Sequence, residues 1–222
     1  MKKKITLYIG SFLLLCGTAV AGYGIFHAPD SDQEALEQEL RHNEELLEQT
    51  ASTPESKPSP TSTKEDITIT VIGDSVFLGA APAFQKIQKN AVIDAKISRQ
   101  VRHGLDVAKK LNEKGKLGNV VILSLGTNGT FHPVTGQELI DYLGPDRIIY
   151  WVNAYGKKLD IQNEVNQTIQ KLVDANENVH LIPWAREAKK HPDWFYQDGT
   201  HLNTQGQDGF SRFIQEKINL PL

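Results

Sequence analysis

Five short apolar runs, separated by segments in which apolar residues recur at helical spacing, fill the chain from residue 66 onward. The runs place Val, Ile and Leu at consecutive positions, which is typical of strands buried on both faces of a parallel sheet. They lie at Ile67–Ile72, Ala91–Ile97, Val120–Leu125, Arg147–Val152 and Val179–Pro183. Helices are predicted at Phe77–Asn90, Leu105–Glu113, Thr135–Leu143, Ile161–Asn176 and Thr204–Ile218. This alternation predicts an α/β fold, a three-layer α/β/α doubly wound domain around a five-stranded parallel sheet.

The start of the chain has a different pattern, with three lysines followed by the uncharged stretch Ile5–Phe26. As a helix this stretch would be about 33 Å long, enough to cross a bilayer core of roughly 30 Å. We therefore expect residues 1–26 to anchor the chain in the cell membrane as a single transmembrane helix, with the domain outside. Two alternatives stay open. Ala19-Val20-Ala21 is a candidate signal-peptide cleavage site that would make the domain secreted, and Cys16 is a weaker candidate for lipidation.

Residues 27–65 lie between the anchor and the domain. Residues 30–50 carry eight acidic side chains against one arginine and lack Pro and Gly. They predict a solvated acidic helical stalk, and the spacing of Leu36, Leu40 and Leu47 leaves a weak coiled coil as an alternative. Residues 51–65 are rich in Ser, Thr and Pro, which is typical of an extended linker. The domain itself is expected to span residues 66–222.

Composition narrows the class of protein. With 39% hydrophobic residues among 222, the chain can bury a core, so wholesale disorder is excluded. A single cysteine excludes a disulfide framework within the chain and a zinc site built on several thiolates. Residues 67–222 carry 18 basic and 16 acidic side chains, a balance that gives no indication of nucleic-acid binding.

Chemistry-bearing residues follow the predicted strands, where parallel sheets place their ligand sites. Ser75 sits on a sharp strand-to-helix turn, where a hydroxyl projects from the sheet edge beside helix amides. Asn128 lies between glycines after the third run, and such an amide can donate to a developing oxyanion, an interaction worth about 3 kcal/mol elsewhere. Asp198 and His201 precede the last helix and can form a carboxylate–imidazole pair. Each motif alone also fits an ordinary turn or helix cap.

Together, these motifs resemble the SGNH (GDSL-like) hydrolase superfamily over residues 67–220. Residues 94–100, 125–129, 151–153 and 198–202 are similar to the extracellular catalytic domain of Gram-positive peptidoglycan O-acetyltransferases. The resemblance implies that Ser75 is the nucleophile, His201 the general base and Asp198 its orienting partner. It also implies an oxyanion hole made by Asn128 and the backbone N–H groups of Ser75 and Ser98. Ser98 stands where the superfamily normally has glycine, so only its backbone amide could donate.

The function expected from this resemblance is a serine acyl-ester enzyme that works through an acyl-enzyme without metal or organic cofactor. It would be an acetyl esterase or an O-acetyltransferase on cell-wall polysaccharide or a small ester, and a transferase would need a separate membrane acyltransferase as partner. Residues 154–158 lack the Pro- and Trp-containing stretch of the acetyltransferases, which leaves the acceptor open. The alternative is a non-catalytic wall- or partner-binding module on a membrane stalk. Arg99 and Arg102 are further candidates, for contact with an anionic substrate.

Overall fold

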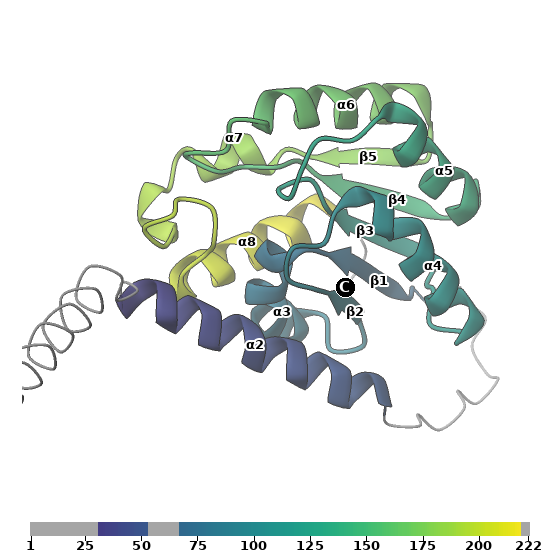
Figure 1. The fold of residues 1–222 in the computed structure, drawn as a ribbon. Helices are drawn as coiled ribbons and strands as arrows, with labels where there is room; N and C mark the ends of the chain where they lie inside the picture. The colour runs from purple at the N-terminus through teal and green to yellow at the C-terminus, as the bar shows by residue number, and fades with distance from the viewer. Residues whose placement is uncertain (1–30, 53–66, 219–222) are drawn as a thin grey trace, which may run out of the picture. The chain divides into compact units, whose positions relative to one another are not determined.

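Five parallel strands form a single sheet in the computed structural model, which describes residues 31–52 and 67–218 (Figure 1). The strand order is β2-β1-β3-β4-β5, and every neighbouring pair is parallel. The strands are β1 (Ile69–Gly73), β2 (Val92–Ala95), β3 (Val120–Ser124), β4 (Ile148–Val152) and β5 (Val179–Ile182). All five predicted strands are confirmed, with ends shifted by a few residues. The chain reverses its direction of winding between β1 and β3, so their carboxyl ends flank the crevice where doubly wound sheets bind ligands.

Helices cover both faces of this sheet, as the apolar pattern predicts. Helices α3 (Ser75–Ile87) and α8 (Thr204–Ile218) pack together on one face, and α4 (Gly104–Glu113), α5 (Pro133–Leu143) and α6 (Gln162–Ala175) follow one another on the other. Consecutive strand residues serve alternate faces, since Val71 belongs to the α3–α8 core and Ile72 to the α4–α6 core. The three-layer architecture is therefore confirmed.

Three shorter helical segments were not predicted. They are α7 (Trp184–Ala188) and two 3-10 turns, η1 (Val101–His103) and η2 (Pro192–Trp194). They lie in the connections that follow β2 and β5, where a few residues of helix are too short for periodicity to reveal. Helix α3 begins two residues earlier than predicted because Asp74 caps it.

The acidic segment forms helix α2 (Ser31–Ser52), but part of it is not solvated as expected. Leu40 is only 5% exposed, and Leu36 and Leu47 pack against the α3–α8 core. The leucines that would form a coiled coil are thus used within this chain. From Leu36 onward, α2 is part of the same compact unit as the sheet.

The membrane anchor expected at residues 1–26, its alternatives and the linker after residue 52 lie outside the described residues. Among the helices within residues 31–52 and 67–218, none combines the length and apolarity needed to cross a bilayer.

Candidate active site

The turn that carries Ser75 is built by the residues on either side of β1's end. Asp74 has extended backbone angles and caps α3, with its Oδ1 accepting a hydrogen bond of 3.0 Å from the backbone N–H of Val76. Gly73 leaves no room for a side chain, since an added Cβ would lie 2.7 Å from Cβ of Phe77. Ser75 is therefore the first residue of α3, at the positive end of the helix dipole.

Three side chains from the two ends of the domain form one hydrogen-bonded chain. Ser75 Oγ lies 2.9 Å from His201 Nε2, and His201 Nδ1 lies 2.6 Å from Asp198 Oδ2. The second carboxylate oxygen, Oδ1, accepts the backbone N–H groups of Thr200 at 2.8 Å and of His201 at 2.9 Å. The aspartate therefore fixes both the loop and the imidazole ring that faces Ser75.

The pKa of Asp198 is lowered in this setting. Partial burial favours the neutral acid, but the hydrogen bonds from the His201 ring and from the backbone N–H groups of Thr200 and His201 outweigh it. The carboxylate is thus charged at neutral pH. It holds the proton of the imidazole on Nδ1 and leaves Nε2 free to accept a proton from Ser75.

Asp74 connects the Ser75 turn to the loop after β3. It is 1% exposed, and its Oδ2 accepts a hydrogen bond of 2.7 Å from the hydroxyl of Thr127. Asn128 Nδ2 in turn donates to Thr127 Oγ1 at 3.0 Å. Burial raises the pKa of Asp74, although Thr127, the N–H of Val76 and His201 act against that rise. Asn128 is thus tied to the Ser75 turn through two hydrogen bonds, and Thr127 is the link that the motif reasoning did not single out.

The loop after β2 carries Ser98 against the same turn. Within the described ranges, Ser98 is the one residue other than glycine with a positive φ, at 58°. Its loop is held to the end of β1, because the N–H of Lys96 donates to the carbonyl of Gly73 at 3.2 Å. The glycine that the superfamily normally has here would adopt this left-handed backbone without strain.

Arg99 holds that loop in place. It is 8% exposed, and its guanidinium donates to the carbonyls of Gly73 and Asp94 and to the carboxylate of Asp94. Burial and these three internal acceptors give Arg99 a structural role, and contact with an anionic substrate stays a prediction. Arg102 remains exposed beside His103.

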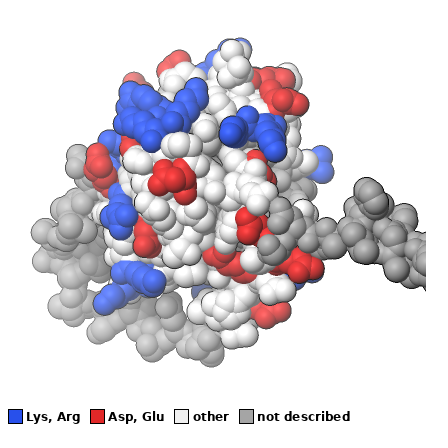
Figure 2. Space-filling model, turned by 90° about the vertical axis from the view of Figure 1, so that its left-hand side faces the viewer, with Lys and Arg blue, Asp and Glu red and all other residues white. Residues whose placement is uncertain are grey.

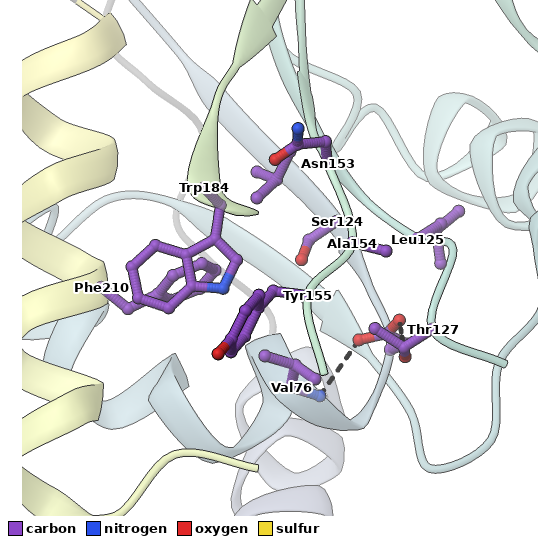
Figure 3. Close-up of a pocket in the computed structure, with 11 residues that line it drawn as sticks. Val76, Ser124, Leu125, Thr127, Asn153, Ala154, Tyr155, Trp184 and Phe210 are labelled. Carbon is purple, nitrogen blue, oxygen red and sulfur yellow. Dashed lines mark hydrogen bonds between the residues drawn. The ribbon is translucent and has the colours of Figure 1, made fainter. Parts of the chain in front are cut away.

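A small cavity of about 10 Å³ is lined by Asp74 and Val76, the residues on either side of Ser75 (Figure 3). The rings of Trp184, Phe210 and Tyr155 gather on one side of it, and Thr127 lies on the other (Figure 3). A cavity of this size is about the smallest that can hold one water molecule. Tyr155 follows β4 in the segment that departs from the acetyltransferase pattern, and no sequence signal marked it as part of the site.

Similarity to known proteins covers about two thirds of the chain. No protein-family model matches the chain. The O-acetyltransferase OatA of Staphylococcus aureus is 34% identical over 155 residues, which are 68% of this chain and 25% of that protein. The chain thus spans about a quarter of the length of the curated relatives it matches.

Two solved structures share the fold. The C-terminal catalytic domain of the Streptococcus pneumoniae peptidoglycan O-acetyltransferase A, with a methylsulfonyl adduct, has a TM-score of 0.60 at 20% identity, covering 68% of this chain and 91% of that one. A member of the lipolytic G-D-S-L family from Veillonella parvula has a TM-score of 0.58 at 15% identity, covering 70% and 100%.

Proposed function

This chain is a relative of the peptidoglycan O-acetyltransferases with the fold of the SGNH/GDSL hydrolases, and from that premise we propose that it is a serine acyl-transfer enzyme. The observation that carries the proposal is the hydrogen-bonded chain Ser75–His201–Asp198 at the carboxyl ends of the strands. Ser75 Oγ lies 2.9 Å from His201 Nε2, and His201 Nδ1 lies 2.6 Å from Asp198 Oδ2. A hydroxyl in contact with an oriented imidazole is the arrangement that an activated serine nucleophile needs.

The reaction has two steps. Ser75 Oγ attacks the carbonyl carbon of an ester while its proton moves to His201 Nε2, and a tetrahedral oxyanion forms. The imidazolium, stabilised by Asp198, then gives its proton to the leaving alcohol, which leaves an acyl-serine. In the second step His201 takes a proton from water or from a sugar hydroxyl, whose oxygen attacks the acyl carbon. The bond from that carbon to Ser75 Oγ then breaks, and His201 returns the proton to Ser75.

The oxyanion is assigned to three donors. The N–H of Ser75 belongs to the first turn of α3, where backbone donors lack intrahelical partners. The N–H of Ser98 and the side-chain amide of Asn128 complete the set, since both residues lie on loops held against the Ser75 turn. Donors fixed in advance stabilise charge more effectively than water, which must reorganise.

For the substrate we propose acetyl esters of cell-wall polysaccharide, on the strength of the peptidoglycan O-acetyltransferases among the relatives. In the transferase form, a membrane acyltransferase supplies the acetyl group and this domain passes it to a sugar hydroxyl. In the esterase form, water is the acceptor. We further propose that residues 1–26 anchor the chain in the cell membrane with the domain outside.

Turnover of p-nitrophenyl acetate tests the enzyme. The wild-type chain should hydrolyse this ester, and Ser75→Ala and His201→Ala should each lower kcat/KM at least about a thousandfold. A fluorophosphonate probe should label the wild type but not Ser75→Ala. His180→Ala, which removes a histidine of β5 whose ring faces Tyr150, is the matched control and should keep wild-type rates. Labelling of Ser75→Ala, or turnover in it, would refute the assignment of the nucleophile.

The acceptor is decided by a competition. An acetyl donor is supplied with chito-oligosaccharides, and acetylated sugar is compared with free acetate. Predominant transfer to sugar identifies a transferase, and predominant acetate an esterase. A wild-type chain that binds cell-wall glycan but turns over neither p-nitrophenyl acetate nor the acetyl donor of this competition would favour the non-catalytic module instead.

A further inference from the structure

Helix α2 contacts the helix that carries Ser75. Asn43 is 5% exposed, and its amide donates to the carbonyls of Leu78 at 3.2 Å and Gly79 at 3.4 Å in α3. Leu40 packs over Gly79, where an added Cβ would lie 3.7 Å from Leu40 Cδ2. A buried amide is costly without hydrogen-bond partners. Asn43 therefore favours this one position of α2 on α3, which an apolar contact alone would not specify.

The same helix also contacts the segment that carries His201. The two carboxylate oxygens of Glu39 accept from different residues: Oε2 from the hydroxyl of Tyr196 at 2.8 Å, and Oε1 from Nε2 of Gln207. These two donors lie on either side of the His201 loop in the sequence. Tyr196 comes before the loop, and Gln207 follows it in the first turn of α8.

Each of these donors holds the backbone next to the imidazole. The N–H of Tyr196 donates to the carbonyl of His201 at 2.9 Å, and its carbonyl accepts the N–H of Gly199 at 2.9 Å. Nε2 of Gln207 donates to the carbonyl of Leu202 at 3.0 Å. The carboxylate of Glu39 thus reaches the loop by two paths. Tyr196 links it to the carbonyl of His201, and Gln207 links it to the carbonyl of Leu202.

We propose that α2 is an internal brace of the active site, and that Glu39 is a positioning residue that holds His201 on Ser75. The brace follows from the geometry above: Asn43 fixes α2 on the helix of Ser75, and Glu39 fixes the loop of His201 on α2. The proposal rests on the proposed function for its effect on turnover, but not for its effect on the loop. Glu39 does not contact the reacting atoms, so it acts through the position of the imidazole.

The test compares three variants of the full chain. Glu39→Ala removes both acceptors and should lower kcat about tenfold with KM within about twofold, because a small displacement of a catalytic group costs rate rather than binding. Glu39→Gln should recover most of kcat, since its amide can accept from Gln207 and donate to the Tyr196 hydroxyl. Glu37→Ala is the matched control, because Glu37 is exposed and pairs with Arg41 on the same helix.

Hydrogen exchange supplies a readout that does not need activity. The backbone amides of Tyr196 and Gly199 should exchange at least about tenfold faster in Glu39→Ala than in the wild type or Glu37→Ala, since local opening loses its restraint. Tyr196→Phe removes only the hydroxyl and should show the same change, and Glu39→Ala in the Tyr196→Phe background should add little.

Two results would overturn the brace. Exchange and kcat in Glu39→Ala equal to those of Glu37→Ala would show that α2 does not hold the loop. A kcat in Glu39→Gln as low as in Glu39→Ala, with a displaced pH–rate profile, would show that Glu39 acts by its charge. If the wild type lacks turnover altogether, the proposed function fails, and the exchange rates alone still decide the brace.

Discussion

Asp74 is buried directly beside the nucleophile, and its ionisation opposes folding. Burial raises its pKa above the usual value of 3.8, so the folded chain binds this proton more tightly than the unfolded chain. The contribution of Asp74 to the free energy of unfolding is therefore greatest below pH 3.8 and is lost as the pH rises through the raised pKa. The hydrogen bonds that Asp74 accepts from the N–H of Val76 and from the hydroxyl of Thr127 offset part of the cost of burying the charged carboxylate.

Replacing Asp74 by asparagine should remove that pH dependence. In Asp74→Asn the amide oxygen can still cap α3, and the amide nitrogen can donate to Thr127 Oγ1. We expect the free energy of unfolding, measured by urea denaturation at pH 5 and pH 8, to vary less with pH than in the wild type. The exposed Asp208→Asn is the control and should follow the wild type. Parallel pH profiles for Asp74→Asn and the wild type would contradict the shift.

Ser98 offers a second prediction at this scale. A left-handed backbone costs a non-glycine residue about 1 kcal/mol, and glycine loses a similar amount through its greater freedom when unfolded. Ser98→Gly should therefore leave the free energy of unfolding within about 1 kcal/mol of the wild type and keep esterase turnover, because the assigned donor is the backbone N–H. Ser98→Val should lose about 2 kcal/mol, since a branched side chain is strained at φ 58°. Loss of turnover in a well-folded Ser98→Gly would show that the hydroxyl is needed.

At the scale of elements, α2 shows how one helix can satisfy two patterns. Its acidic positions predict a solvated face, and its leucines predict an apolar seam. The structure satisfies both, because Leu40 faces the α3–α8 core while Glu37 and Arg41 remain exposed. The helix therefore contributes to the stability of the domain.

Alanine substitutions on the two faces of α2 measure this contribution. Leu40→Ala should lower the free energy of unfolding by about 2–3 kcal/mol, as for other buried leucines. Leu46→Ala, at a position 42% exposed, should change it by less than about 0.5 kcal/mol. Urea denaturation of the full chain gives both values. Equal small effects at the two positions would mean that α2 leaves the domain in solution.

For the whole molecule, the winding of the sheet creates the site. Because β1 and β3 are neighbours on opposite sides of the reversal, the loops after them meet, and α8 brings the His201 loop to the same edge. Basic and acidic side chains both occupy the face shown in Figure 2. Together with the near-balance of charges in residues 67–222, this gives no indication of a polyanionic ligand.

The proposed location is tested by fractionation of cells that express the full chain. If residues 1–26 form a retained anchor, the protein should stay in the membrane fraction after carbonate extraction, enter detergent, and be cut by protease added to protoplasts. Recovery of a shortened chain from the medium would favour cleavage of the segment. Complete protection from protease in intact protoplasts would contradict an external domain.

The sequence by itself determined the architecture and the identity of the candidate residues. Continuous apolar runs and helical periodicity are local properties, so the five strands and the main helices followed from them, with errors at ends set by caps such as Asp74. Ser75, Asn128, Asp198 and His201 were marked by short motifs whose chemistry depends on residue type.

Only the tertiary structure decided how these residues meet and what supports them. The separation of 2.9 Å between Ser75 and His201 joins residues 126 positions apart, and no local pattern contains it. The roles of Arg99 and Glu39 likewise depend on tertiary packing. The charge of Arg99 predicted a ligand contact, whereas its burial lets it hold the loop after β2. Glu39 is one of many acidic residues in its segment, and only its contact with Tyr196 distinguishes it. A side chain's role depends on which groups desolvate it and which accept its hydrogen bonds, and those groups are assembled only when distant segments pack.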